Sequence, residues 1–272
     1  MKTEESLVNT HQLNALLTAV FKAGRVILAI RERGVKTLTK NDGSPVTIAD
    51  QQAEVILLHA IHQQFPQIPI IAEEAAEAGK IPAIADRFFL VDPLDGTKEF
   101  IQSGTDFTVN IGLIEHGMPV FGIVYAPASG QLYVGETPNR AWQAHVDCLF
   151  APDTIAQQTL QVAQPDQQNI RAVASRSHRD EQTNNWLQAR NIAQVVAAGS
   201  SIKFCVLARG DADVYPRFGP TMQWDTAAGH AVLLGAGGRV MGVDGQPFLY
   251  GKTTQERPFL NPGFIACGGW RE

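Results

Sequence analysis

Two stretches near the N-terminus place apolar residues at helical spacing. In residues 13–30, apolar side chains recur every three or four positions, and Gly34 follows as a stop signal. Residues 47–65 repeat the pattern after a polar turn at residues 40–45. Asp50 falls in the first turn of this second stretch, where the positive end of the helix dipole stabilises its ionised carboxylate. We predict two amphipathic helices over these ranges.

The middle of the chain is a series of short apolar segments bounded by Gly, Pro or Asp. Such segments predict strands at residues 68–72, 88–92, 107–114, 120–125 and 131–134, with a hairpin turn at residues 115–118. Strand and helix patterns then alternate. We predict strands at residues 171–174, 193–197 and 212–215, and helices at residues 180–189, 201–208 and 226–234.

A polar segment without strong periodicity, residues 149–164, separates these two styles of organisation. We therefore predict an N-terminal α+β lobe over residues 1–155 and a smaller C-terminal α/β lobe over residues 156–272.

Composition supports a sizeable core and limits the partners. The chain has 272 residues, of which 44% are hydrophobic, and 22 basic against 27 acidic residues give a net charge of -5. An acidic balance gives no general attraction to nucleic acid or anionic lipid, although a local basic pocket for a phosphate is compatible with it. The cysteines Cys148, Cys205 and Cys267 are widely spaced, which argues against a disulfide framework and against a zinc site.

The first ten residues carry no basic-then-apolar signal pattern, and no stretch approaches the roughly 20 apolar residues that span a bilayer. We therefore expect a cytoplasmic protein without a transmembrane segment. Peripheral association with the inner membrane stays open, as does the choice between a monomer and a homodimer.

The most informative chemistry lies in residues 88–97, where two carboxylates follow an apolar run. Asp92 and Asp95 stand three residues apart, with Gly96 and Thr97 directly behind them. Pro93 has no N–H for a further ladder bond, so we expect the strand to stop at Asp92 and the chain to turn toward a cleft. The layout predicts a metal-assisted phosphoryl site.

Further acidic residues join this set from other segments. Glu73 and Glu74 follow the predicted strand at residues 68–72, and Asp225 precedes the last predicted helix. Oxygen ligands from separate segments suit Mg²⁺, with Mn²⁺ as a substitute, and two such ions can clamp a phosphoryl oxygen. Each acidic pair taken alone is compatible with a solvated loop or a helix cap. His59 and His62 have no third ligand near them in the sequence, so we set them aside as helix-surface residues.

Longer strings around these residues resemble the signatures of a known family. Glu73-Glu74, Asp92-Pro93-Leu94-Asp95-Gly96-Thr97 and Trp224-Asp225-Thr226-Ala227-Ala228-Gly229 resemble those of the inositol monophosphatase superfamily of Mg²⁺-dependent, lithium-sensitive phosphatases. Other strings narrow the resemblance to the CysQ-type 3′(2′),5′-bisphosphate nucleotidase branch; they include Ser44-Pro45-Val46-Thr47, Lys98-Glu99-Phe100, Ser175-Arg176-Ser177-His178 and Gly199-Ser200-Ser201.

The resemblance implies a role for each matching residue. Glu73, Asp92, Asp95, Asp225 and the backbone carbonyl of Leu94 would hold two or three Mg²⁺ ions. The catalytic pair would be Asp50 and Thr97: the threonine hydroxyl positions the attacking water, and the carboxylate accepts the hydroxyl's proton in a hydrogen bond. The phosphate would rest against the amides of Gly96 and Thr97.

The resemblance also implies a fold and a substrate. The fold is a layered α/β (α+β) sandwich with a large antiparallel sheet in the N-terminal lobe, and the site lies between the lobes. The substrate would be a small nucleotide, adenosine 3′,5′-bisphosphate, with 3′-phosphoadenylyl sulfate as a second candidate. Besides Glu73, Leu94, Asp95, Gly96, Thr97 and Asp225, the implied substrate contacts are Ser175, His178, Ser201 and Lys203. Arg217 is a further candidate, with a surface arginine as the alternative.

Two other functions stay open from the sequence. The first is an inositol or sugar monophosphatase on the same fold. The second is a non-catalytic sensor that binds a phosphorylated ligand. The set Asp50, Glu73, Asp92, Asp95, Thr97 and Asp225 speaks against the sensor, because a pure binder does not need to position a water.

Overall fold

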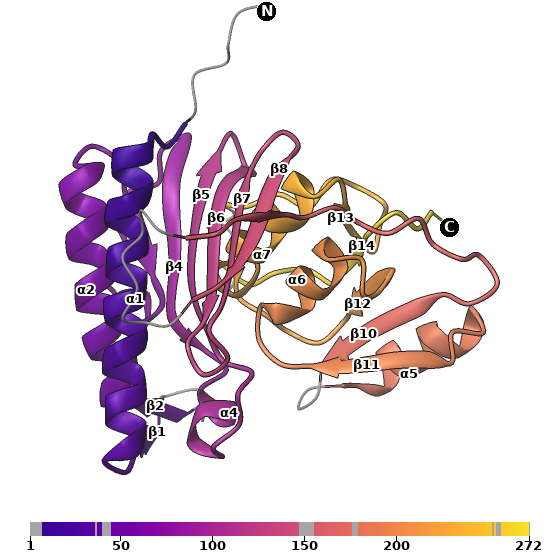
Figure 1. The fold of residues 1–272 in the computed structure, drawn as a ribbon, viewed down its shortest axis with the longest axis horizontal. Coiled ribbons are helices and arrows are strands. Elements are labelled where there is room, and N and C mark those ends of the chain that lie inside the picture. The colour runs from indigo at the N-terminus through magenta and orange to yellow at the C-terminus, as the bar shows by residue number, and fades with distance from the viewer. Residues whose placement is uncertain are drawn as a thin grey trace, which may run out of the picture.

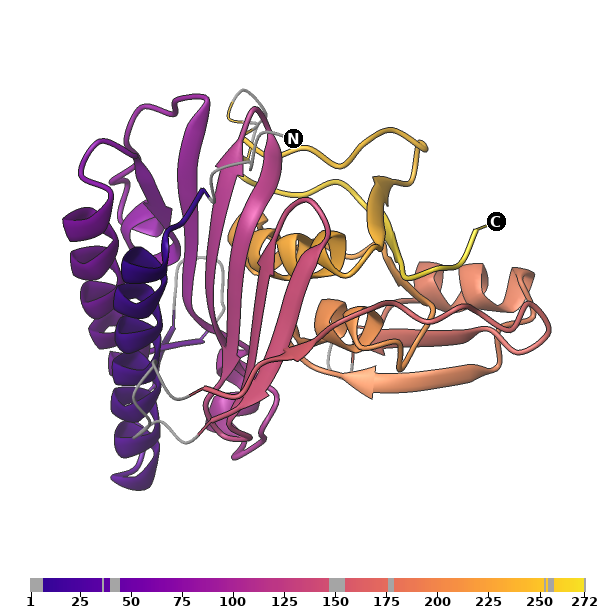
Figure 2. The same cartoon turned by 45° about the horizontal axis from the view of Figure 1, so that its top comes forward.

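A computed structural model describes residues 7–35, 37–39, 45–146, 155–175, 179–251, 253 and 257–271. The elements stack in five layers (Figures 1 and 2): helices α1 and α2, a large sheet, helices α6 and α7, a small sheet, and helix α5. The helices are α1 (Thr10–Glu32), α2 (Ile48–Gln64), α3 (Glu73–Glu77), α4 (Thr97–Ile101), α5 (Glu181–Ala189), α6 (Ile202–Ala208) and α7 (Gln223–Gly235). The predicted layered α/β sandwich is confirmed.

The large sheet has seven strands in the order β3-β4-β5-β6-β7-β8-β9. β3 and β4 pair in parallel, and each later neighbour pairs antiparallel. Its strands are β3 (Ile70–Ala72), β4 (Arg87–Asp95), β5 (Thr108–Glu115), β6 (Met118–Ala126), β7 (Gln131–Glu136), β8 (Arg140–His145) and β9 (Gln158–Thr159). The hairpin predicted between β5 and β6 is present, and both its residues, His116 and Gly117, have positive φ as a two-residue type I′ turn requires.

The small sheet has the order β11-β10-β12-β14-β13 and mixes parallel with antiparallel pairs. Its strands are β10 (Arg171–Ser175), β11 (Gln194–Ala198), β12 (Val214–Arg217), β13 (Arg239–Gly242) and β14 (Phe264–Cys267). A two-stranded ribbon of β1 (Thr37–Thr39) and β2 (Pro45–Thr47) stands apart from both sheets. The sequence analysis did not predict strands β1, β2, β8, β9, β13 and β14.

One prediction about β4 was wrong. The strand does not stop at Asp92 but continues through Pro93 to Asp95. Asp92 pairs with Asn110 and Asp95 with Thr108, so the register shifts between the two aspartates. The missing N–H of Pro93 is absorbed in this bulge rather than ending the strand.

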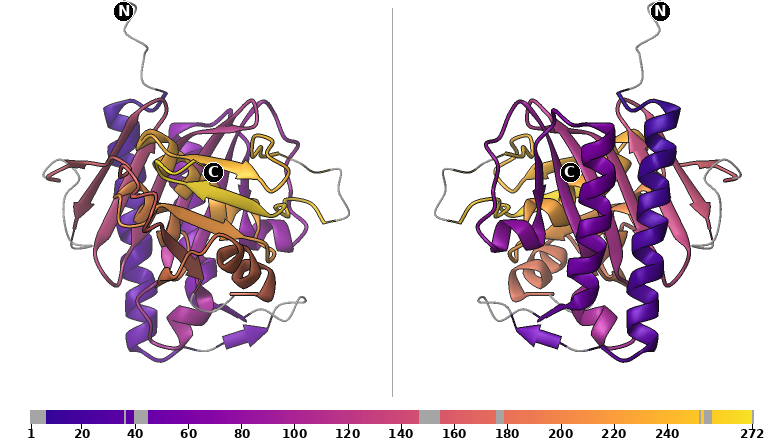
Figure 3. Two further views of the ribbon diagram at one scale, coloured as in Figure 1. Left: turned by 90° about the vertical axis from the view of Figure 1, so that its right-hand side faces the viewer. Right: turned by 90° about the vertical axis from the view of Figure 1, so that its left-hand side faces the viewer.

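The two long helices cover the outer face of the large sheet (Figure 3). A capping box starts α1, since the side chains and backbone amides of Asn9 and Gln12 bond reciprocally. By length and composition alone α1 could cross a membrane, because its most apolar 18-residue window has a mean hydropathy of 1.6. This corrects the expectation that no stretch is apolar enough. Its residues Leu16, Val20, Phe21 and Ile27 are nevertheless buried in the core, as in an ordinary core helix.

The division at residue 155 stays a prediction, and two features describe how the halves join. β9 lies beyond that residue yet pairs with β8 of the large sheet. One hydrophobic cluster contains Leu90 and Val124 of the large sheet together with Phe264 of the small sheet and Phe204 of α6. The predicted turn at residues 40–45 lies outside the described residues apart from residue 45, as does the first part of the predicted boundary segment.

Helix α7 packs against a row of glycines on the large sheet. Gly112, Gly122 and Gly135 lie side by side on β5, β6 and β7 as register partners. A Cβ atom on Gly122 would stand 2.4 Å from the carbonyl oxygen of Ala228, and one on Gly135 would stand 2.4 Å from the Cα of Val232. The helix backbone therefore sits where side chains would otherwise be.

This contact predicts that Gly122→Ala destabilises the protein by about 1–3 kcal/mol or more, because the added methyl group must push a helix backbone aside. Chemical denaturation measures the change. Gly268→Ala is the matched control, since its added Cβ would meet no atom closer than 3.6 Å. Equal stability of the two variants would contradict the close packing.

Candidate active site

The predicted acidic motif lies at the C-terminal end of β4, which lines the space between the two sheets. Asp92 is 1% exposed, and its Oδ1 accepts the backbone N–H of Leu94 at 3.0 Å. Gly96 then takes a φ of 91°, and a Cβ there would lie 2.9 Å from the carbonyl oxygen of Asp106. Only glycine suits this turn, which leads directly into α4 at Thr97.

Glu73 comes to the same place because β3 runs parallel to β4. Ala72 is the register partner of Val91, so the residues that follow them, Glu73 and Asp92, emerge side by side. The burial of Asp92 and the nearby charge of Glu73 both raise the pKa of Asp92. Glu73 directly follows β3, as predicted, whereas Asp92 lies within β4 and only Asp95 stands at its end.

Asp50 and Thr97 meet as a hydrogen-bonded pair. Asp50 is 1% exposed, and its Oδ2 accepts both the backbone N–H and the side-chain hydroxyl of Thr47 at 2.8 Å. Its Oδ1 lies 3.2 Å from the hydroxyl of Thr97, which is also 3.2 Å from the carbonyl oxygen of Leu94. Thr97 can donate its single proton to only one of these acceptors at a time. The sequence did not predict this second acceptor.

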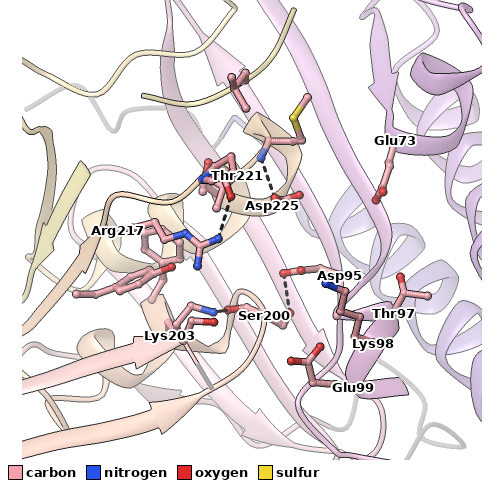
Figure 4. Close-up of a pocket in the computed structure, with 18 of the residues that line it drawn as sticks. Glu73, Asp95, Thr97, Lys98, Glu99, Ser200, Lys203, Arg217, Thr221 and Asp225 are labelled. Carbon is pink, nitrogen blue, oxygen red and sulfur yellow. Dashed lines mark hydrogen bonds between the residues drawn. The ribbon is translucent and has the colours of Figure 1, made fainter. Parts of the chain in front are cut away.

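Asp225 reaches the site from the opposite side, at the start of α7. Its Oδ2 accepts the backbone N–H of Met222 at 2.8 Å, which is the arrangement of a carboxylate in the first turn of a helix. Figure 4 shows Asp225 across the pocket from Glu73. Asp95 lies below both of them in this view, next to Thr97. Glu73, Asp95 and Asp225, which are distant from one another in the chain, thus face one space.

That space is a cavity of about 350 Å³ between the two sheets. Its acidic side is formed by Glu73, Asp95 and Asp225, with Asp92 buried behind them. Burial and the charges of Glu73, Asp95 and Asp225 raise the pKa of Asp92 well above its usual 3.8, and burial with the charges of Asp95 and Glu73 does the same for Asp225. The four carboxylates repel one another.

The residues fit divalent cations by their chemistry. Carboxylate and carbonyl oxygens are hard donors, and a cation among them would relieve the repulsion that raises these pKa values. Within the described ranges, no three acidic, His or Cys side chains are grouped tightly enough to form a finished metal cage.

The other side of the cavity is basic. Lys203 is 6% exposed, and its ammonium donates to the carbonyl oxygen of Ser200 at 2.6 Å and lies 5.5 Å from the ring centre of Tyr215. Burial lowers the pKa of Lys203 to about 8. Arg217 is 8% exposed and donates to the carbonyl oxygens of Gly219 and Pro220, so it is not a surface arginine. Lys98 and Arg257 also line the cavity.

The predicted substrate contacts are placed as follows. Ser175, Lys203, Gly96 and Thr97 line the cavity, whereas His178 lies outside the described residues. Ser201 does not line it: the side chain is 1% exposed and lies beneath Asp95 and Asp225. Ser200 lines the cavity instead, with a φ of 51° and a hydroxyl that donates to Asp95. The Gly199-Ser200-Ser201 string signalled this loop, but not which serine faces the cavity.

Comparison with known proteins identifies the family. The model of the inositol monophosphatase family matches residues 9–261, which is most of the chain. The chain belongs to the inositol monophosphatase family.

Within this family, the chain is similar to bacterial proteins named 3′(2′),5′-bisphosphate nucleotidase CysQ. It is 40% identical over 244 residues to the one from Escherichia coli K12, a match that covers 89% of this chain and 94% of that protein. The match to the protein from Salmonella typhimurium is 41% over 245 residues, with the same coverage.

The fold comparison agrees. The crystal structure of CysQ from Bacteroides thetaiotaomicron, described as a bacterial member of the inositol monophosphatase family, superposes with a TM-score of 0.78 at 33% identity. The match covers 97% of this chain and 99% of that chain. An inositol monophosphatase from Thermotoga maritima superposes with a TM-score of 0.75 at 20% identity, over 96% of this chain and 93% of that one, and shares the fold.

Because these carboxylates repel one another, we expect them to lower the free energy of unfolding when no metal is bound. With EDTA at neutral pH, Asp92→Asn should raise the free energy of unfolding by on the order of 1 kcal/mol. Because the pKa of Asp92 is raised in the folded state, wild-type stability is retained below the usual 3.8 and is lost as the pH rises through the folded-state value. The gain should therefore appear near neutral pH and vanish in acid.

Urea denaturation at several pH values measures this difference. Asp86→Asn, at an exposed acid in the loop before β4, is the matched control and should change little. If Asp92→Asn were less stable than the wild type in EDTA at neutral pH, the repulsion would not be the dominant effect.

Proposed function

We propose that this chain is a 3′(2′),5′-bisphosphate nucleotidase that hydrolyses the 3′-phosphate of adenosine 3′,5′-bisphosphate to give AMP and phosphate. The observation that carries the proposal is the single cavity with an acidic side next to the Asp50–Thr97 pair and a basic side with Lys203 and Arg217. A substrate with two phosphates needs both sides. The similarity to proteins that bear this name supports the choice.

Glu73, Asp92, Asp95, Asp225 and the carbonyl of Leu94 are the residues that would hold Mg²⁺, in two or three sites, with Mn²⁺ as a substitute. Divalent cations would polarise the phosphoryl group and lower the pKa of the attacking water. The buried position of Asp92 and the cavity shared by Glu73, Asp95 and Asp225 support this assignment.

Thr97, hydrogen-bonded to Asp50, orients the attacking water. The Thr97 hydroxyl donates to Asp50, so its oxygen can accept a hydrogen bond from the water and orient it toward phosphorus. The water oxygen forms a bond to phosphorus and gives up one proton, while the bond between phosphorus and the ribose 3′ oxygen breaks. That oxygen takes up one proton and leaves as the 3′ hydroxyl of AMP, so the net proton transfer is from the water to the leaving oxygen. The backbone amides of Gly96 and Thr97 are the donors for the phosphate oxygens.

The basic side takes the second phosphate. Lys203 and Arg217 supply positive charge in a half-enclosed space, where charged hydrogen bonds are stronger than in open water. Ser175 adds a hydroxyl beside them. We extend the proposal to 3′-phosphoadenylyl sulfate as a second substrate, since it carries the same 3′-phosphate, and to the cytoplasm as the site of action.

A phosphate-release panel tests the proposal. Purified protein with Mg²⁺ should release phosphate from adenosine 3′,5′-bisphosphate much faster than from inositol 1-phosphate or fructose 1,6-bisphosphate at equal concentration, because only the first pairs an adenosine with a second phosphate. A preference for the inositol or sugar ester would favour the monophosphatase alternative. No release from any ester would favour a non-catalytic sensor.

Replacing Lys203 separates nucleotide binding from chemistry. Lys203→Ala should raise KM for the bisphosphate roughly 10- to 100-fold, the loss of a charged hydrogen bond, with a much smaller effect on a small phosphate ester. In the wild type, KM should also rise as the pH passes about 8, where the Lys203 ammonium loses its proton.

Lys203→Arg is the control for that pH dependence, because a guanidinium stays charged throughout the range. Its KM should stay flat across pH 8. Equal losses on both substrate classes, or the same pH profile in wild type and Lys203→Arg, would refute the role of Lys203.

A further inference from the structure

A buried hydroxyl connects the acidic residues of the two halves of the site. Ser201, at the start of α6, is 1% exposed and does not line the cavity. Its oxygen lies 2.6 Å from the main-chain carbonyl oxygen of Asp225 and 3.0 Å from Oδ2 of Asp95. One hydroxyl thus contacts one residue from the end of β4 and one from the start of α7.

The side-chain amide of Asn110 orients the Ser201 hydroxyl. Asn110, on β5, donates its side-chain N–H to the Ser201 oxygen at 2.9 Å. This bond occupies one lone pair of the Ser201 oxygen. The hydroxyl proton therefore points toward one of two acceptors, the carbonyl oxygen of Asp225 or Oδ2 of Asp95. Asn110 is 0% exposed, and its side-chain oxygen has no partner among the described residues. The bond that it donates to Ser201 is therefore the hydrogen bond that its buried side chain makes.

A second hydroxyl completes the arrangement at Asp95. Ser200 donates to the same Oδ2 atom at 2.7 Å, and Thr108, the register partner of Asp95 on β5, bonds to the Ser200 hydroxyl. Ser200 therefore holds Oδ2 of Asp95 directly, while Ser201 shares its single proton between this oxygen and the carbonyl oxygen of Asp225. The other oxygen, Oδ1, is left for the cavity.

We propose that Ser201, oriented by Asn110, is a positioning residue that fixes Asp95 relative to Asp225, so that carboxylates from two separate elements can bind the same metal cluster. The inference rests on the proposed function, because it takes both aspartates as metal ligands. Ser201 acts through these ligands and touches neither substrate nor water. Hydrogen bonds to the ligands of a metal commonly decide its affinity in this way.

The experiment measures Mn²⁺ binding to the full chain without substrate, by calorimetric titration and by the electron paramagnetic resonance signal of free Mn²⁺. Ser201→Ala should raise the Mn²⁺ dissociation constant about tenfold or more. The Mg²⁺ concentration for half-maximal phosphate release should rise by the same factor, while KM for the nucleotide at saturating Mg²⁺ stays near the wild-type value. Ser129→Ala, which removes a hydroxyl bonded to a backbone carbonyl away from the site, is the matched control and should bind Mn²⁺ as the wild type does.

Asn110→Leu provides a second test that does not depend on how well Ser201→Ala folds. It keeps the side-chain volume but removes the donor, so it should also weaken Mn²⁺ binding, and the double variant should bind no more weakly than Ser201→Ala alone. Wild-type Mn²⁺ affinity in a folded Ser201→Ala or Asn110→Leu protein would overturn the inference, even if its thermal stability were lower. Absence of Mn²⁺ binding by the wild type would instead overturn the metal assignment of the proposed function.

Discussion

The close contact of α7 with the large sheet is the constraint on which the rest of the structure depends. Its backbone fits the row formed by Gly112, Gly122 and Gly135, where no side chain separates helix from strands. This contact sets the start of α7 opposite the end of β4, and so brings Asp225 to Asp95. It also joins the two halves of the chain through a shared hydrophobic cluster, which contains both Leu90 and Phe204. The site is therefore a product of the interlayer packing and not of either half alone.

That packing holds charges together that would otherwise move apart. The fold keeps like charges close in one cavity, and burial together with these charges raises the pKa values of Asp92 and Asp225. Such an arrangement is unfavourable by itself and persists because the surrounding core is large and well packed. The basic side of the cavity relieves this repulsion only in part: the charge of Arg217 lowers the pKa of Asp225, but burial and the neighbouring carboxylates outweigh it. The acidic side thus keeps its affinity for cations, and the basic side keeps its affinity for anions.

Much of this could be predicted from the sequence, where local patterns decide the structure. The helical spacing of apolar residues predicted α1 and α2, and continuous apolar runs predicted β3 to β6. The acidic residues after β3 and near the end of β4 indicated where the site lies. Features set by tertiary contacts were not predicted. Pro93 did not end β4, because a bulge absorbs its missing N–H. Strands β13 and β14 are only four residues long and exist through pairing with each other and with β12. Which of two adjacent serines faces the cavity depends on the left-handed backbone of Ser200, which no local pattern indicates.

The aspartates of the site share one structural principle. Each has one oxygen fixed by a hydrogen bond that belongs to the fold: Asp50 accepts the N–H of Thr47, Asp225 that of Met222, and Asp92 that of Leu94. Asp95 is held in the same way by the serine hydroxyls. For Asp50 and Asp225 this partner is the first turn of a helix, whose dipole favours the ionised form as well as the orientation. Because the fixed oxygen determines the rotamer, the second oxygen is directed without any contribution from a ligand. A bound metal or water then meets donors whose side-chain entropy was already lost on folding, which is the physical meaning of a preorganised site.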